Sequence, residues 1–438
     1  MIIHWLFSLP VLLAARNADG GIHRPRRPAT HQAQLTDFYF QSPMSRWHWA
    51  MREFDQRLDH LNSFSGGMFK QRYMLNTTFW GGVEKQAPMF FFTGAEGGDI
   101  TRVVGAYGHV IEMAERMQGL VVMMESRFFG SSLPFGRQDS YRAPVDRVGL
   151  LTVEQVLLDY VEIIIAVHAE FDPEWRCPSI AFGGSLAGTQ AAMIRFKYPT
   201  VVDMSLASSA PLHGFPTPGF DAAAWRKRVT DTWVELATGQ HGCPVFGLVQ
   251  RAFASFENAD PDAVKQALNT CETPYPGNNW DARDEFWAHI ESYGTYGYPW
   301  STSAIPKLCE LAFYTSKLPT AGGLDIAAAF LPETTGCLNL TASRERENFP
   351  DSKGWDLLAC TEIVHPIGAT NVTDFFPPSR WSVEATAEEC RGRWNATPRD
   401  AGLWIPRMFG FGALKASPSS DLSNWASHVI FSYGELDP

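Results

Sequence analysis

The sequence predicts an α/β fold: a mostly parallel, doubly wound sheet carrying an inserted, mainly helical cap that contains disulfides. Two patterns predict it. Between about residues 88 and 210, short continuous apolar segments alternate with amphipathic segments of helical period. Strands that are apolar on both sides are typical of a parallel sheet with helices on both faces. After about residue 213 this alternation stops, and six of the seven cysteines lie between Cys243 and Cys390.

The elements of the first part follow one another in the order that a doubly wound sheet requires. We expect strands at 88–94, 120–130, 179–185 and 202–211, and helices at 103–117, 151–171 and 188–198. The helix over 151–171 has the strongest pattern, because Val153, Val156, Leu157 and Tyr160 fall on one stripe. The helix expected over 188–198 ends at Pro199.

A Pro/Gly-rich stretch at 211–219 marks the boundary of the insertion. Helical patterns then appear at 222–239, 262–271 and 282–293, and the strand pattern returns at "HVIFSYGELDP". We therefore expect a signal peptide over 1–18, the first part of the α/β domain over 50–212, the helical cap over 213–400 and the continued α/β domain over 401–438.

Several features favour the secretory pathway. The apolar run from Ile2 to Ala15 is too short to span a bilayer and is followed by small residues, which is typical of a signal peptide; a buried N-terminal strand or helix is the alternative. Four N-x-T triplets are candidate glycosylation sites, at Asn76, Asn339, Asn371 and Asn395. The cysteines lack C-x-x-C spacing and fit an oxidising compartment, so we expect a secreted or a lysosomal/vacuolar protein.

Composition also excludes some partners. The formal net charge is −11 and no basic run exists, so nucleic acid is not an expected partner. No later stretch is long and apolar enough for a membrane-spanning helix. We expect neither a cofactor nor a metal, because no motif for one is present, and the oligomeric state is left open.

A serine in "AFGGSLAG" is the candidate nucleophile. In a nucleophile elbow, small residues two before and two after the serine permit a sharp strand-to-helix turn; here these are Gly183 and Ala187 around Ser185. Ala187 departs from strict G-x-S-x-G, but an apolar strand precedes the turn and a helical pattern follows it. The alternative is an ordinary serine in a glycine-rich turn.

An activated serine needs a histidine base, an acid that orients it and an oxyanion hole. Asp437 follows the last predicted strand and is the candidate acid. The backbone N–H of Leu186 and that of Ala95 or Glu96, in "TGAEGG", are the candidate oxyanion donors. A phosphate-binding loop is the competing interpretation of "TGAEGG", but it has neither GxGxxG nor a P-loop lysine.

Several ordered blocks of the sequence resemble one family. They are "FDQRLDHLNSFSGGMFKQRYMLNTTFW", "FFTGAEGGDI", "ESRFFGSSLPFG", "LTVEQVLLDY", "FGGSLAG", "SSAPL" and "GELDP". Together they resemble the prolyl-specific serine exopeptidases, which include lysosomal Pro-Xaa carboxypeptidase, a lysosomal dipeptidyl-peptidase and thymus-specific serine protease. The resemblance runs from about Phe54 to the end of the chain.

The resemblance implies an α/β-hydrolase domain with a helical cap and a Ser-Asp-His triad, in which Ser185 is the nucleophile and Asp437 the acid. Four positions differ from the family pattern: Ala95 stands for Asn, Ser126 for His, Leu186 for Tyr and Thr189 for a Met that lines the proline pocket.

The expected function is hydrolysis of peptide bonds on the carboxyl side of proline, or of a small residue, near a peptide terminus, through an acyl-enzyme on Ser185. Alternatives are a secreted esterase or lipase of the same fold and a non-catalytic peptide-binding relative. The resemblance places the triad histidine after Asp437. We therefore expect this chain to lack both that histidine and the last strand of the α/β domain, and its activity to be impaired. His365 and His428 both precede Asp437 and are poor candidates for the base.

Overall fold

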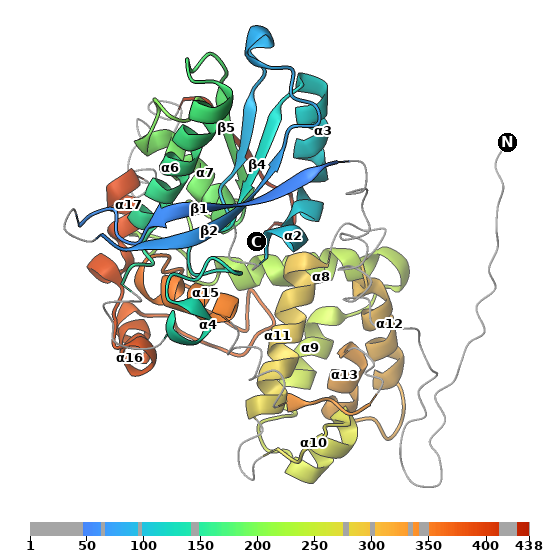
Figure 1. The fold of residues 1–438 in the computed structure, drawn as a ribbon. Coiled ribbons are helices and arrows are strands. Elements are labelled where there is room, and N and C mark those ends of the chain that lie inside the picture. Colours follow the sequence, from blue (N-terminus) through green and yellow to red (C-terminus); the bar gives the residue numbers. More distant parts are fainter. Residues whose placement is uncertain are drawn as a thin grey trace, which may run out of the picture.

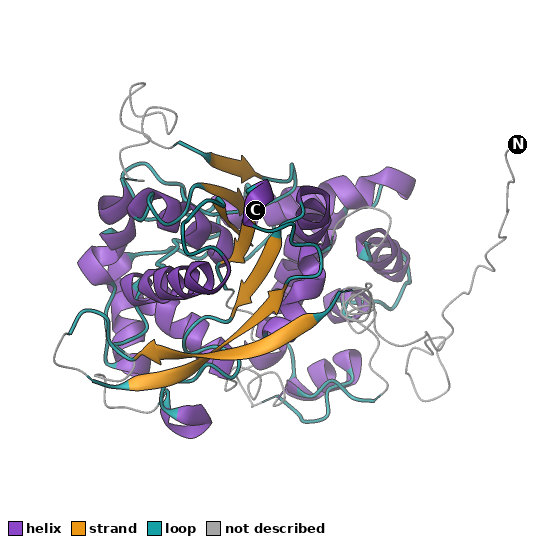
Figure 2. Ribbon diagram, turned by 45° about the horizontal axis from the view of Figure 1, so that its top comes forward, coloured by secondary structure: helices purple, strands orange, loops and turns teal. Residues whose placement is uncertain are grey.

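A computed structural model describes residues 47–62, 66–94, 99–141, 149–274, 280–297, 303–331, 336–340, 350–410 and 427–437. The described strands form one sheet of seven, in the order β1-β2-β4-β3-β5-β6-β7. Figure 2 shows it as a single twisted layer with helices around it. The strands are β1 (Trp49–Arg57), β2 (Met68–Asn76), β3 (Met89–Phe92), β4 (Leu120–Met124), β5 (Ser179–Gly184), β6 (Met204–Ser208) and β7 (Val429–Ser432).

Most of the sheet is parallel, as predicted. Strands β4, β3, β5, β6 and β7 run parallel, whereas β1 pairs antiparallel with β2 and β2 antiparallel with β4. The two antiparallel strands were not predicted. In β1 most side chains are exposed or half-buried, because this strand forms one edge of the sheet. An edge strand lacks the continuous apolar run by which the buried strands were recognised.

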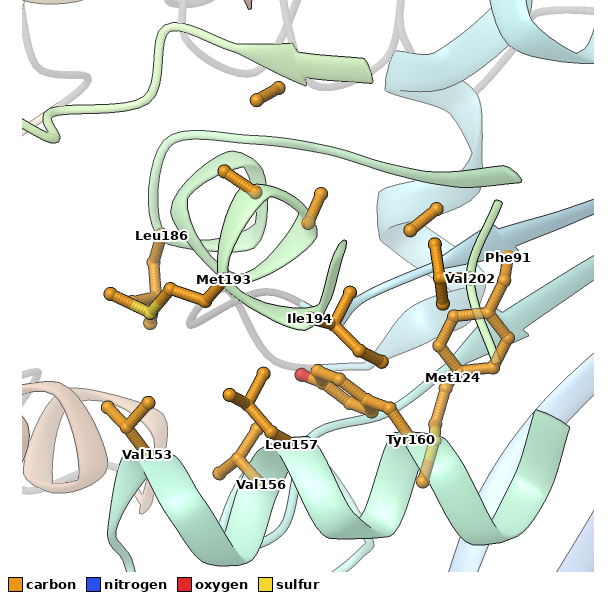
Figure 3. Packing of buried hydrophobic residues seen from close by; sticks show 14 of the residues in the cluster. Phe91, Met124, Val153, Val156, Leu157, Tyr160, Leu186, Met193, Ile194 and Val202 are labelled. Carbon is orange, nitrogen blue, oxygen red and sulfur yellow. The ribbon is translucent and has the colours of Figure 1, made fainter. Parts of the chain in front are cut away.

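Helices cover both faces of the sheet, and β3 shows this directly. Phe91 belongs to the hydrophobic cluster on one face, while Phe90 and Phe92 belong to the cluster on the other. In Figure 3 Phe91 lies among Tyr160 of α6 and Ile194 of α7. The helices of this part of the chain are η2 (Val83–Lys85), α2 (Ile100–Val103), η3 (Val104–Tyr107), α3 (Gly108–Met117), α4 (Gly136–Asp139), α6 (Val153–Phe171) and α7 (Leu186–Lys197). The predicted doubly wound fold is confirmed.

A second group of helices has its own core and lies below the sheet in Figure 1. Its centre is aromatic: Trp233, Phe286 and Phe330 are fully buried there. The helices are α8 (Ala224–His241), α9 (Val245–Ala254), α10 (Pro261–Leu268), α11 (Trp280–Tyr296), α12 (Ile305–Ser316) and α13 (Gly323–Phe330). The helical, disulfide-containing insertion is thus present, and its boundaries at 213 and 400 stay a prediction.

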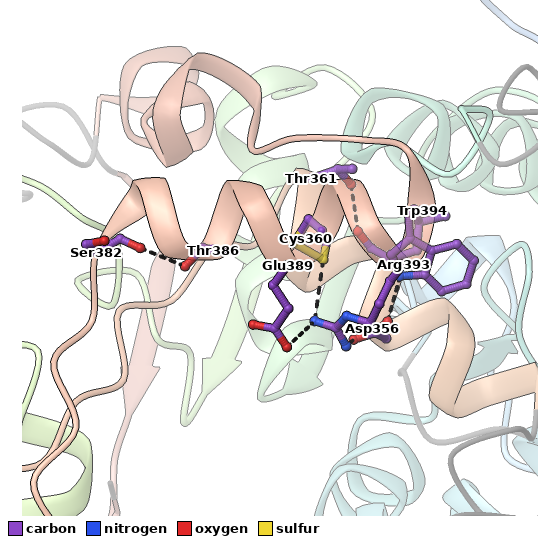
Figure 4. The surroundings of a disulfide bond; sticks show 10 residues. Asp356, Cys360, Thr361, Ser382, Thr386, Glu389, Arg393 and Trp394 are labelled. Atoms are coloured by element: carbon purple, nitrogen blue, oxygen red, sulfur yellow. Dashed lines mark hydrogen bonds and ion pairs between the residues drawn. A yellow bond between two sulfur atoms is a disulfide. The ribbon is translucent and has the colours of Figure 1, made fainter.

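The helices after this group return to the sheet. Leu357, Leu358, Ile405 and Phe409 are part of the same cluster as Phe91. In Figure 4, Asp356 accepts hydrogen bonds from the guanidinium of Arg393 and the indole of Trp394, beside the Cys360–Cys390 disulfide. These helices are α15 (Pro350–Thr361), α16 (Val383–Trp394), η4 (Arg399–Gly402) and α17 (Trp404–Phe409).

Six cysteines are paired and one is not. The disulfides are Cys243–Cys309, Cys271–Cys337 and Cys360–Cys390. Cys177 is free and buried, and burial raises the pKa of its thiol to about 11. A buried thiol accounts for the odd number of cysteines without a partner from elsewhere. Among the described helices none is both long and apolar enough to cross a membrane.

Candidate active site

Ser185 lies at the turn between β5 and α7 in a strained backbone conformation. Its φ is 56° and its ψ −125°, a region that few residues other than glycine adopt. The turn leaves Ser185 exposed while Phe182 before it and Leu186 after it are buried. This is the geometry of a nucleophile elbow, which lifts the serine hydroxyl above the edge of the sheet.

Small residues make this turn possible. A Cβ on Gly183 would lie 2.5 Å from the carbonyl carbon of Ala187, and a Cβ on Gly188 would lie 2.5 Å from the carbonyl oxygen of Ser208. Because these contacts are with backbone atoms, no side-chain movement could relieve them. The strand and helix therefore pack at the separation that only glycine at positions 183 and 188 allows.

Three hydrogen bonds donated by backbone N–H groups hold the elbow. The N–H of Ser185 donates to the carbonyl of Ser208 at the end of β6 (3.1 Å). The N–H of Gly184 donates to the phenol oxygen of Tyr107 (3.0 Å), and the N–H of Thr189 donates to the carbonyl of Ser185 (2.9 Å). The turn is thus fixed from the neighbouring strand, from η3 and from its own helix.

Asp437 and Ser185 both lie at the carboxyl ends of the parallel strands. Because β5, β6 and β7 are adjacent and parallel, the turns that follow them lie at the same end of the sheet. The Ser208 and Ser432 hydroxyls are 2.9 Å apart, and the Tyr433 hydroxyl donates to the carbonyl of Ala210 (2.6 Å). The turn after β6 therefore contacts both the elbow and the segment that leads to Asp437.

Asp437 is held in place through hydrogen bonds of the backbone rather than through its carboxylate. Its N–H donates to the carbonyl of Gly434 (3.2 Å), and the preceding carbonyl, of Leu436, accepts from the Thr232 hydroxyl of α8 (3.2 Å). Figure 1 shows α8 beside this end of the chain. Oδ2 of Asp437 is buried and has no hydrogen-bond partner within the described residues. A buried carboxylate oxygen of this kind needs a donor.

Of the candidate oxyanion donors, only Leu186 can be placed. It is the first residue of α7, and an amide in the first turn of a helix has no partner within that helix. Its side chain packs into the core under α7, beside Met193 in Figure 3, which anchors the backbone around it. Ala95 and Glu96 lie outside the described residues.

Neither of the two histidines considered as a base lies in a triad arrangement. The carbonyl of His428 accepts a hydrogen bond from the N–H of Ser205, near the start of β6. His428 therefore lies at the amino ends of the parallel strands, whereas Ser185 lies at their carboxyl ends. Its Nδ1 is 3.1 Å from a guanidinium nitrogen of Arg195. Nδ1 of His365 is 2.6 Å from the carbonyl oxygen of Gly214, and burial lowers the pKa of His365.

Another serine, histidine and aspartate lie together, but they are buried and far from the elbow. Nε2 of His168 is 2.7 Å from Oγ of Ser179, and Nδ1 is 3.2 Å from Asp172. All three are buried, and Ser179 is the first residue of β5, at the far end of the strand from Ser185. This cluster ties the end of α6 to β5 and is inaccessible to a substrate.

Two groups of ion pairs were not predicted, although their residues lie in the family blocks of the sequence. Arg127 pairs with Asp159 (2.6 Å), and Asp159 is 2.7 Å from Nε2 of His60. Arg72 pairs with buried Glu125 (2.8 Å) and with Asp99 (3.0 Å), and this raises the pKa of Arg72. Partners so distant in sequence carry no local signal; only the motif blocks around them could have singled them out.

The candidate glycosylation sites differ in accessibility. Asn339, Asn371 and Asn395 are exposed. Asn76 is only 2% exposed, at the end of β2, and its side-chain oxygen accepts a hydrogen bond from the N–H of Thr78. A glycan does not fit at Asn76 in this fold, because the amide nitrogen is enclosed by protein.

Residues 56–438 match the family described as serine carboxypeptidase S28. The chain belongs to this family. It is 29% identical over 415 residues to lysosomal Pro-X carboxypeptidase of Bos taurus, covering 89% of this chain and 77% of the bovine protein. The Homo sapiens protein of that name is 27% identical over 448 residues, with 98% of this chain and 83% of the relative covered.

A more partial match is human thymus-specific serine protease, which is 34% identical over 162 residues, or 36% of this chain and 29% of the relative. The solved structure of the peroxisomal α/β-hydrolase Lpx1 from Saccharomyces cerevisiae is 11% identical over 44% of this chain and 57% of the other, with a TM-score of 0.28, and adds nothing to the assignment. The family resemblance is confirmed: the chain is an S28 serine peptidase, and the esterase alternative is not favoured.

Proposed function

We propose that this S28 peptidase hydrolyses the bond on the carboxyl side of proline, or of a small residue, near a peptide terminus, through an acyl-enzyme on Ser185. The observation that carries the proposal is the exposed, strained Ser185 at the elbow between β5 and α7. Asp437, whose buried Oδ2 has no hydrogen-bond partner among the described residues, is the proposed acid. The preference for proline rests on the relatives named Pro-X carboxypeptidase.

In the proposed reaction, Oγ of Ser185 attacks the scissile carbonyl carbon while a histidine accepts the hydroxyl proton. The N–H of Leu186 donates to the oxyanion that forms, together with an N–H of Ala95 or Glu96. The histidine returns the proton to the leaving amine, and water then hydrolyses the ester on Ser185. The proposal requires a histidine base within reach of both Ser185 and Asp437.

The proposed location is the secretory pathway, either outside the cell or in a lysosome or vacuole. Three disulfides support an oxidising compartment. The names of the lysosomal relatives point the same way. Exposed Asn339, Asn371 and Asn395 are the proposed glycan acceptors.

The test uses the full-length protein and matched blocked peptides that end in Pro-Xaa, Ala-Xaa or Leu-Xaa. We expect release of the terminal residue from the Pro-Xaa peptide and, more slowly, from the Ala-Xaa peptide. Ser185→Ala should abolish both reactions, while Ser131→Ala, a change at an exposed serine, should leave them intact. Turnover of simple esters without turnover of any peptide would contradict the proposal, and so would peptide binding without cleavage.

The choice between the two peptide termini is tested with the same protein. A dipeptidyl-peptidase releases an Xaa-Pro dipeptide from a free N-terminus, whereas a carboxypeptidase removes the residue after proline at a free C-terminus. The relatives named carboxypeptidase lead us to expect C-terminal cleavage. Release of the N-terminal dipeptide only would overturn this part of the proposal.

A further inference from the structure

Thr93 lies directly after β3 and connects this strand to the elbow. Its side chain is fully buried. Its hydroxyl donates to the carbonyl of Ala187 at 2.6 Å and lies 3.2 Å from the carbonyl oxygen of Phe182. Its N–H also donates to Phe182, at 3.2 Å. One residue thus contacts the backbone on both sides of Ser185.

The carbonyl of Ala187 belongs to the first turn of α7, one residue after Leu186. The N–H of Leu186 belongs to the same turn, so a bond that fixes this carbonyl also restrains the backbone that carries the N–H. The Thr93–Ala187 bond fixes this turn to β3, a central strand that pairs with both β4 and β5. At 2.6 Å in a buried setting, the bond is short and shielded from competing water.

We propose that Thr93 is a positioning residue, whose hydroxyl holds the N–H of Leu186 where it can donate to the oxyanion. The inference rests on the proposed function, because it assigns the purpose of the bond to acyl transfer at Ser185. Thr93 touches neither the substrate nor the reacting atoms. Its removal should slow the chemical step and leave substrate binding unchanged, since an oxyanion donor acts in the transition state.

The decisive variants are Thr93→Val, which deletes the hydroxyl and keeps the branched shape, and Thr93→Ser, which keeps the hydroxyl. Thr295→Val is the matched control: Thr295 is also buried, and its hydroxyl donates to one helical carbonyl, that of Glu291, in α11. All three are compared with the parent full-length protein.

We expect Thr93→Val to lower kcat about 10-fold with KM unchanged, because a small displacement of a catalytic group is costly. The affinity for a peptide boronate, which forms a tetrahedral adduct on the serine, should fall by a similar factor. Thr93→Ser should restore both, and Thr295→Val should change neither. An unchanged kcat, a loss confined to KM, or a loss that Thr93→Ser fails to restore would overturn the inference.

A second measurement does not depend on turnover. Hydrogen exchange of the amides at 186–189 should be faster in Thr93→Val than in the parent, and normal in Thr93→Ser and Thr295→Val. Unchanged exchange in Thr93→Val would overturn the inference even in a protein without peptidase activity. If the exchange changes but the parent protein cleaves no peptide, the positioning contact stands and the proposed function fails.

Discussion

Replacing Gly188 by alanine tests whether close packing of α7 on β6 sets the nucleophile. The added Cβ would lie 2.5 Å from the carbonyl oxygen of Ser208, whereas ordinary contact begins at 3.4 Å, so α7 or the turn after β6 must move by about 0.9 Å (3.4 − 2.5). Ser208 also accepts the N–H of Ser185, so the displacement reaches the nucleophile. A shift of about 1 Å at a catalytic group costs roughly 100-fold in rate.

The same substitution should destabilise the protein by about 1–3 kcal/mol, as overpacking does, partly offset by up to about 1 kcal/mol because alanine favours a helix over glycine. The assays are kcat/KM on the Pro-Xaa peptide, the rate of fluorophosphonate labelling and thermal unfolding. Gly392→Ala is the control, since a Cβ there, on α16, meets nothing within 4 Å. Undiminished labelling of Gly188→Ala would refute the packing argument.

Three other predictions concern stability and reactivity. Burial lowers the pKa of His289 from 6.5 to about 3, so the unfolded chain takes up the proton first on acidification and stability falls as the pH drops below about 6.5. His289→Phe should therefore reduce the difference in unfolding free energy between pH 7 and pH 5 by about 2 kcal/mol, measured by urea denaturation; an unchanged difference would contradict this. The pKa of Cys177 is raised from 9.0 to about 11, so iodoacetamide at pH 8 should alkylate it about 100-fold more slowly in the native than in the unfolded protein, and equal rates by mass spectrometry would show that the thiol is accessible. Removing the Cys271–Cys337 disulfide by serine substitution at both positions should cost about 4 kcal/mol, given its separation of 66 residues, and a loss under 1 kcal/mol in urea denaturation would indicate that the unfolded chain is already constrained there.

The central part of the fold could be predicted because its signals are local. The strands β3 to β6 are short apolar runs, and α6 and α7 carry a helical pattern beside them. The helix expected over 103–117 proved to be the last residue of α2 followed by η3 and α3, and the chain changes from 3-10 to α geometry at Gly108. Neither β1 nor several insertion helices were predicted, because β1 is an exposed edge and the helices lie among loops rich in proline and glycine.

At the site, Ser185 could be predicted since the elbow is a contiguous motif. Asp437 could be proposed from its position after the last strand. The contacts that hold them could not be predicted: Thr93 and Ala187 are 94 residues apart, and Ser208 and Ser432 are 224 apart. Such contacts form only when the strands assemble, so no local sequence pattern predicts them.

The central claim is that Ser185 is the nucleophile. The most direct measurement is mass spectrometry of the full-length protein after reaction with a fluorophosphonate, followed by sequencing of the modified peptide. We predict one adduct, on Ser185, that is lost in Ser185→Ala and kept in Ser131→Ala. An adduct on another serine, or none in a folded protein that cleaves the Pro-Xaa peptide, would contradict the claim.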